Sequence, residues 1–265
     1  MIVHFYTPLA ILCYLIATGL LVRPLLNAGP PLTKPAMAAA LVAVLLQLAV
    51  SLGLHRGALD LHFFAALGLV AGTMSALTVL VNMARPVAAL GVIVFPLTAI
   101  LLGTDVYLAP ATTPLQIDWQ IKLHVTIALL AFGVLLIAAL LAIFLSMQER
   151  ALRRHRFNGW LRVLPPLTLT EGLLFKLIGA GFVLLTATLI TGALFVDNLF
   201  GQHLVHKTIL SILAWLVFGA LLFGRWRYGW RGRPAVNLTL IGMGMLMLAF
   251  LGSKLVLELI LHRVN

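Results

Sequence analysis

Long apolar runs separated by short polar segments make up almost all of this chain. A helix needs about 20 apolar residues to cross a hydrocarbon core, and eight runs approach or exceed that length. They lie at 7–26, 35–54, 61–82, 86–103, 122–147, 173–196, 206–224 and 236–261. Because backbone in lipid must satisfy its own hydrogen bonds, each run is expected to be helical. The pattern therefore predicts an all-α fold, a polytopic bundle of about eight transmembrane helices forming a single membrane domain over 1–265.

Composition agrees with this reading and excludes several classes of protein. The chain is 62% hydrophobic and only 9% charged, far from the roughly 25% charged residues of soluble domains. The first run has no Lys or Arg before Arg23 and no small-residue cleavage pattern at its end, so we expect a retained helix rather than a signal peptide. The only cysteine, Cys13, lies in that run. A disulfide, a CxxC pair and a CxxCH haem attachment are therefore excluded, and with them a c-type cytochrome or a thiol-disulfide carrier.

The net charge of +11 is distributed unevenly between alternate loops. One side collects Arg23, Lys34, Arg85, Arg150, Arg153, Arg154, Arg156, Arg162, Arg225, Arg227, Arg231 and Arg233, and the other has Arg56, Lys122, Lys207 and Arg263. By the positive-inside rule this predicts both termini periplasmic and the 148–172 loop cytoplasmic, in a bacterial inner membrane. We interpret the RRHR run at 153–156 first as a topology determinant, second as a contact for anionic lipid, and only remotely as a nucleic-acid site.

Several polar residues have an ordinary structural explanation. Thr168 and Glu171 have the spacing of a capping box before the sixth run. The threonines at 186, 188 and 191 in that run are expected to serve close helix packing. The sequence contains no recognisable nucleophile–base pair, phosphate loop or Walker motif, so nothing supports ATP-driven transport by this chain alone. We also do not expect an enzyme.

Six of the eight histidines fall at the predicted outer face: His55, His62, His124, His203, His206 and His262. Imidazole is a common ligand for haem iron and for other metals, although a single interfacial histidine is more often a solvated side chain. His203 and His206, spaced i and i+3, form with Asp197 a candidate divalent metal site, and a hydrated helix start is the alternative.

The amino-acid sequence of the last third of the chain is specific enough to indicate a protein family. The segments GFVLLTATLITGALF, HKTILSILAWLVFGALLFGRWRYGWRGRPA and FLGSKLVLELILH resemble the C-terminal half of the CcsA/HemX family of cytochrome c assembly membrane proteins, and most closely its small YpjD-like branch. The resemblance implies haem binding or haem handling at the outer face, in association with other cytochrome assembly proteins. The chain departs from haem-delivering members in one loop, which reads DNLFGQHLVHK in place of a Trp-rich motif, and has Phe223 where many relatives have a histidine.

The resemblance also assigns candidate residues. Its implied haem ligands are His124, in KLHVTIALLAFG, and His262, in LILHR. Lys254, Glu258 and His262 recur every four residues and so share one helical face. That stripe is either a structural ion pair, or Glu258 orients His262 while Lys254 faces a haem propionate. Further candidates for propionate binding at the rim are Arg56, Lys207 and Arg263.

The sequence therefore predicts a haem-handling factor with haem and the lipid bilayer as partners, acting by coordination. Two alternatives stay open. A permease subunit for another small anion would use the Lys254 and Glu258 stripe as its path. A cofactor-free scaffold or regulator would keep the fold without binding haem.

Overall fold

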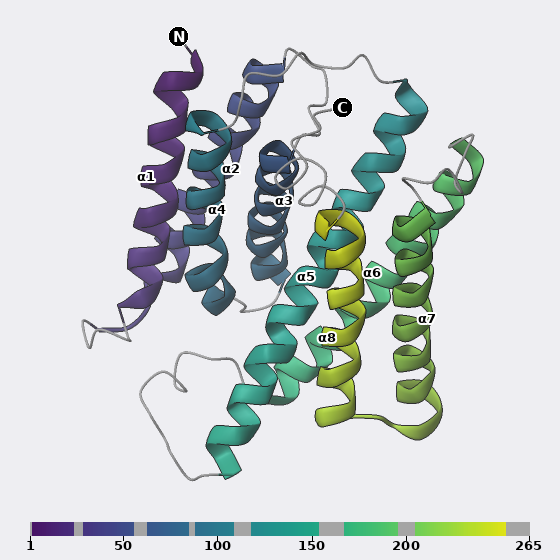
Figure 1. The fold of residues 1–265 in the computed structure, drawn as a ribbon. Helices are drawn as coiled ribbons and strands as arrows, with labels where there is room; N and C mark the ends of the chain where they lie inside the picture. The colour runs from purple at the N-terminus through teal and green to yellow at the C-terminus, as the bar shows by residue number, and fades with distance from the viewer. Residues whose placement is uncertain are drawn as a thin grey trace. The chain divides into compact units, whose positions relative to one another are not determined.

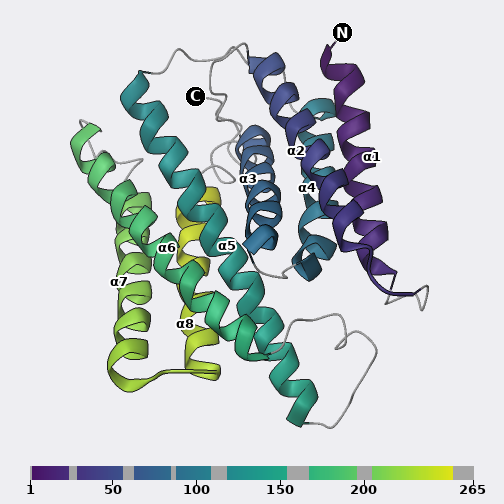
Figure 2. The same ribbon diagram turned by 180° about the vertical axis from the view of Figure 1, so that it is seen from behind.

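The computed structural model describes residues 2–23, 29–55, 63–84, 88–108, 118–153, 167–195 and 205–252. Within these ranges all regular structure is helical, and eight α-helices follow one another (Figures 1 and 2). They are α1 (Ile2–Val22), α2 (Thr33–His55), α3 (Phe63–Ala84), α4 (Gly91–Tyr107), α5 (Trp119–Arg153), α6 (Leu167–Phe195), α7 (Val205–Tyr228) and α8 (Arg233–Met247). A 3-10 turn over Ala88–Leu90 precedes α4, and a π-helical turn over Leu248–Gly252 follows α8.

By length and composition, seven helices in the described part of the chain are able to cross a membrane. The eighth, α4, is apolar but has only 17 residues, and the 3-10 turn before it extends the run. The expected all-α, multi-pass fold is confirmed. The sidedness of the termini and the single membrane domain remain predictions.

Two helices extend well past their predicted ends. The apolar run 122–147 corresponds to α5, which has 35 residues and continues through Arg153. The added turns contain Gln, Glu, Ala, Leu and Arg, which are good helix formers, so the helix continues where the hydrophobic run stops. At its rise of 1.5 Å per residue α5 is about 52 Å long, which exceeds a hydrocarbon core of ~30 Å. Likewise α6 begins at Leu167, six residues before the expected position.

The helices group into two compact units, α1–α4 and α5–α8. In the first unit α1 packs against α2 and α4, and α3 packs against the same two helices, which closes a ring. Buried polar bonds join these helices: Tyr14 Oη donates to Gln47 Oε1 at 2.7 Å, and Gln47 Nε2 donates to the Gly68 carbonyl at 3.0 Å. Satisfied hydrogen bonds are required for polar groups at such depth.

The second unit is also a four-membered ring. In it α5 packs against α6 and α8, and α7 packs against the same two helices. Leu135, Ile178 and Phe218 are fully buried within it. Phe132 of α5 packs against Phe250 of the π-helical turn, with ring centroids 5.2 Å apart. All of the predicted site residues that can be placed belong to this unit.

Candidate functional site at the two ends of the second unit

The four helices of the second unit alternate in direction, so the unit has two chemically different ends (Figures 1 and 2). We call the basic end the one where α5 and α7 finish and α6 and α8 begin. It has Arg150 and Arg153 on α5 and Arg225 and Arg227 on α7. We call the histidine end the one where α5 and α7 begin and α6 finishes. The charge asymmetry expected from the loops is thus present within this unit.

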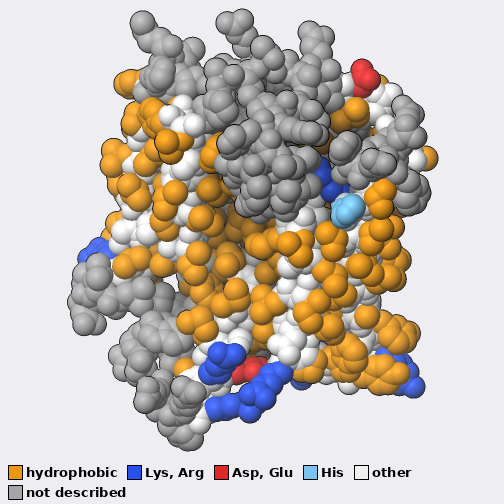
Figure 3. Space-filling view, viewed as in Figure 1, with side chains coloured by type: hydrophobic (Ala, Val, Ile, Leu, Met, Phe, Trp, Pro, Cys, Tyr) orange, Lys and Arg blue, Asp and Glu red, His pale blue; other side chains and the backbone are white. Residues whose placement is uncertain are grey.

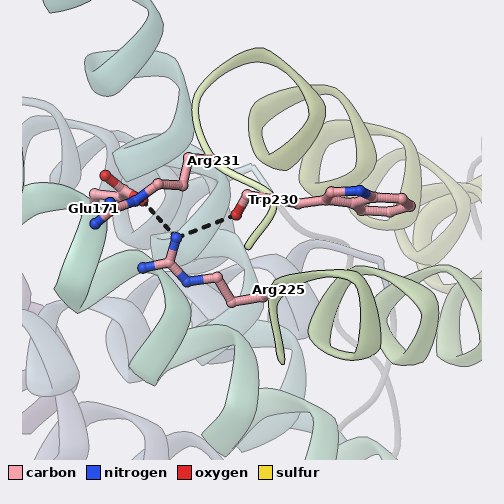
Figure 4. Close-up of polar contacts among 4 residues, drawn as sticks. All are labelled: Glu171, Arg225, Trp230 and Arg231. Carbon is pink, nitrogen blue, oxygen red and sulfur yellow. Dashed lines mark hydrogen bonds and ion pairs between the residues drawn. The ribbon is translucent and has the colours of Figure 1, made fainter. Parts of the chain in front are cut away.

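At the basic end one carboxylate holds two arginines. Glu171 Oε1 accepts a hydrogen bond from Arg231 Nε at 2.8 Å and from Arg225 Nη1 at 3.0 Å. Arg225 Nη1 also donates to the Trp230 carbonyl at 3.2 Å (Figure 4). Its guanidinium lies 4.5 Å from the ring centroid of Phe175. The Glu171 side chain is 10% exposed, against 29% for Arg225 and 66% for Arg231. The carboxylate is therefore a nearly buried charge that two cations compensate.

The turn between α7 and α8 is shaped to deliver these arginines. Gly229 and Gly232 have positive φ angles of 66° and 58°, which side chains with a Cβ rarely adopt. The N–H groups of Gly229 and Trp230 donate to the carbonyls of Arg225 and Gly224. A Cβ on Gly224 would collide with the Trp230 ring, so this glycine makes room for the returning chain. Local backbone geometry thus fixes Trp230 and Arg231 against the end of α7.

The capping box expected at Thr168 and Glu171 is not what the structure has. Helix α6 already begins at Leu167, so Thr168 lies inside it rather than at its cap. The Glu171 carboxylate accepts hydrogen bonds from Arg225 and Arg231. The physical reason is that a nearly buried carboxylate needs a compensating charge, which guanidinium groups supply and backbone N–H groups do not.

At the histidine end, His124 is the one predicted haem ligand that the described residues allow us to locate. It lies in the second turn of α5, is half-buried, and its Nδ1 is 3.0 Å from Thr191 Oγ1 on α6. Trp119 and Phe195, with ring centroids 6.2 Å apart, pair the same two helix ends. Both the ring and its hydrogen-bond partner therefore come from helices that pack against each other.

The hydrogen bonds of Thr191 favour one tautomer of the neutral His124 ring. The Thr191 hydroxyl donates to the carbonyls of Ala187 at 2.9 Å and Thr188 at 3.1 Å. When its single hydrogen is directed to either of these carbonyls, its oxygen accepts from Nδ1–H. The neutral ring then has an unprotonated Nε2, which is the state that coordinates a metal.

A second threonine of α6 has a similar role. Trp215 Nε1 on α7 donates to Thr186 Oγ1 at 2.8 Å, and its indole stacks on Phe182 with centroids 5.4 Å apart. Two of the three threonines expected to serve packing alone are thus hydrogen-bond acceptors for ring N–H groups on neighbouring helices. They join α6 to α5 on one side and to α7 on the other.

The remaining predicted site residues divide into two groups. His206 is exposed and Lys207 half-buried at the start of α7. Those outside the described residues are Arg56, His203, Lys254, Glu258, His262 and Arg263. Within the described ranges, no group of three or more His, Cys, Asp or Glu side chains is placed to hold a metal ion. The metal site at His203 and His206 and the stripe of Lys254, Glu258 and His262 therefore stay predictions.

Aromatic side chains mark the basic end as a membrane boundary. Trp226 is 81% exposed and Tyr228 67% exposed, and Phe223 pairs with both rings. Tryptophan and tyrosine are enriched where a bilayer meets water. Together with seven helices able to span a membrane, they define this chain as a polytopic α-helical membrane protein.

Comparison with known proteins gives the family. Residues 30–261 match the family model described as cytochrome C assembly protein. The chain belongs to that family, which confirms the resemblance found in its C-terminal segments. No solved structure matches the chain.

The curated relatives are similar over part of their length. The chain is 37% identical over 150 residues to the inner membrane protein YpjD of Escherichia coli strain K12, covering 56% of each chain. It is 36% identical over 143 residues to an uncharacterised 28.8 kDa protein of Azospirillum brasilense, covering 53% of each. It is 28% identical over 184 residues to the cytochrome c biogenesis protein CcsA of Thermosynechococcus vestitus, covering 56% of this chain and 57% of the relative. The chain thus matches only about half the length of these relatives.

Proposed function

We propose that this protein is a haem-binding factor of cytochrome c biogenesis in the bacterial inner membrane, and that it acts by holding haem rather than by catalytic turnover. The observation that carries the proposal is the 3.0 Å contact between His124 Nδ1 and Thr191 Oγ1. An imidazole whose Nδ1–H is bound to Thr191 offers Nε2 to an iron atom in a fixed direction. Haem would supply the iron and two propionates for the protein to bind.

Family and location support the proposal. The matched model covers most of the chain, and a relative that is 28% identical is named for cytochrome c biogenesis. Another relative is named as an inner membrane protein. The histidine end, opposite the arginines, would face the periplasm by the positive-inside rule. His262 is the proposed second ligand, with Arg56, Lys207, Lys254 and Arg263 as partners for propionates and Glu258 as the partner of His262.

The experiment is an absorption spectrum of the detergent-purified protein after addition of haem. We expect a Soret band in the wild type and a lower haem content or a shifted band in His124→Ala. The control is His155→Ala, which removes a histidine of the basic 153–156 run and should leave both unchanged. Equal spectra for the wild type and His124→Ala would remove His124 as a ligand.

The two alternatives give different results, the scaffold in the same detergent preparation and the permease after reconstitution into sealed vesicles. A cofactor-free scaffold stays colourless at every haem concentration. A permease for another anion transports its substrate equally well with and without the His124 side chain. Either outcome would contradict haem binding at the histidine end.

A further inference from the structure

A polar cavity lies at the basic end of the second unit, between the end of α5 and the start of α8. Its volume is about 230 Å³, far above the ~15 Å³ that one water molecule needs. The side chains that give it its chemistry are Ser146, Glu149, Arg150, Arg153, Arg233 and Asn237. A group of Lys and Arg side chains around an acidic one is visible at the lower edge of Figure 3.

Within the part of the chain that the structure describes, the arginines of this cavity lack the carboxylate partner that Arg225 and Arg231 have. Arg225 and Arg231 share the Glu171 carboxylate. By contrast, no ion pair joins Arg150, Arg153 or Arg233 to any side chain in the described ranges. Three guanidinium groups facing one cavity repel each other, and an anion placed among them removes that repulsion.

The single carboxylate of the lining is directed toward the backbone of α8. Glu149 Oε1 lies 3.0 Å from the position that a Cβ on Gly232 would occupy. Gly232 is the N-cap residue of α8, and the positive end of the helix dipole stabilises a carboxylate there. The helix start thus accounts for Glu149.

We propose that this cavity binds a phosphate group. Guanidinium forks match phosphate oxygens in pairs, and the Ser146 hydroxyl and Asn237 amide are neutral donors beside them. The exposed Trp226 and Tyr228 place the same end at the boundary between lipid and water, which is the depth of phospholipid headgroups. The phosphate belongs either to an anionic lipid or to a free phosphate compound.

Two measurements on the full chain in detergent separate these sources. Native mass spectrometry counts bound phosphatidylglycerol, with phosphatidylcholine as the reference lipid. Thermal unfolding is followed with inorganic phosphate, with acetate at equal ionic strength as the reference anion. The variants are Arg150→Gln, Arg233→Gln and their combination. The control is Arg227→Gln, which removes an exposed arginine of the same end that does not line the cavity.

Each cavity variant should weaken binding about tenfold, because a hydrogen bond to a charged group is lost. Arg227→Gln should have no comparable effect. Selective loss of phosphatidylglycerol adducts identifies the lipid, and selective loss of stabilisation by inorganic phosphate identifies a free phosphate compound.

Equal binding by the cavity variants and Arg227→Gln would overturn the proposal, as would a wild type that prefers neither phosphatidylglycerol nor phosphate. Arg150→Lys keeps the charge and the fold but loses the guanidinium fork. It should bind more weakly than the wild type and more tightly than Arg150→Gln. Binding equal to that of the wild type would show that only net charge attracts the ligand, and would contradict a phosphate site.

Discussion

Glu171 is the residue on which the basic end depends most. Its carboxylate is almost buried, and one oxygen accepts hydrogen bonds from two arginines that are 54 and 60 residues away in the chain. The two arginines are not equivalent. Arg225 has additional contacts with the Trp230 carbonyl and the Phe175 ring, whereas Arg231 is 66% exposed and its attraction is screened by solvent.

Replacement of Glu171 should therefore destabilise the protein more than replacement of either arginine. Glu171→Gln leaves two cations without a counter-charge, and we expect a loss of about 3 kcal/mol. Arg225→Gln should cost more than Arg231→Gln, because Arg225 is less exposed and has more partners. Thermal unfolding in detergent measures the order, with the exposed Arg227→Gln as control. Equal losses for the three cluster variants would show that Glu171 is not the common acceptor.

The second residue-scale prediction concerns Thr191. Thr191→Val keeps the shape of the side chain but removes the acceptor for His124 Nδ1–H, so the ring is no longer held in one tautomer and direction. Loss of such a partner typically lowers metal affinity about 10- to 100-fold. A haem titration followed at the Soret band should therefore show weaker binding by Thr191→Val than by the wild type. Thr188→Val, which also lies near the end of α6, is the control, and equal affinity for Thr191→Val and the wild type would contradict the assigned role.

At the scale of elements, the α7–α8 turn controls whether the arginines reach Glu171. Gly224 has no room for a Cβ because the Trp230 ring occupies that space, and Gly229 and Gly232 bend the chain back. The backbone conformation of the α7–α8 turn therefore affects the geometry of the Glu171 charge cluster. The position of the arginines is thus set by packing as well as by attraction.

Gly224→Ala should consequently displace the turn and destabilise the protein by about 1 to 3 kcal/mol, the usual range for overpacking. Gly244→Ala in α8 is the matched control, because nothing lies within 4 Å of the added methyl group. Alanine also has the higher helix propensity, so the control should be neutral or up to ~1 kcal/mol more stable. Thermal unfolding of the two variants tests this prediction. Similar melting temperatures would show that the turn tolerates a displaced Trp230 ring.

The helices were accessible to sequence analysis because a ~30 Å apolar core imposes a minimum length on each run. His124 could be predicted as a ligand because the sequence around it resembles that of the family. The Glu171 cluster was missed because Thr168 lies three residues before Glu171, which suggested a local partner. One feature of the sequence did indicate an ion pair for Glu171. An acidic residue at the end of an apolar run needs a cation, and the predicted cytoplasmic loops are rich in arginine. Sequence alone could not select Arg225 and Arg231 among them, since that choice depends on the fold of the α7–α8 turn.

For the whole molecule, the Glu171 pairs show that the start of α6 and the end of α7 lie at one end of the second unit. This agrees with the assignment of the 148–172 and 225–233 loops to one side of the membrane. The absolute orientation is still a prediction from the arginine distribution.

Reporter fusions test that orientation. Chains truncated and fused after Arg156 and after Arg231 should both give a cytoplasmic signal, because arginine-rich loops are retained on that side. A fusion within 196–204 serves as the control and should report the periplasm. A periplasmic signal from either arginine fusion would contradict the assignment of the arginine-rich loops to the cytoplasm. Opposite signals from the two fusions would contradict their location at the same end of the second unit.

The distance in sequence between Glu171 and its arginines also has a consequence for biosynthesis. At translation rates of about 5 to 20 residues per second, Arg231 is made roughly 3 to 12 s after Glu171. Until Arg225 is made, 54 residues after Glu171, the start of α6 has a negative charge and neither of its two cations. We therefore expect the nascent second unit to stay open until the α7–α8 hairpin is complete, and an insertion chaperone or a protease would meet α5 and α6 in that unpaired state.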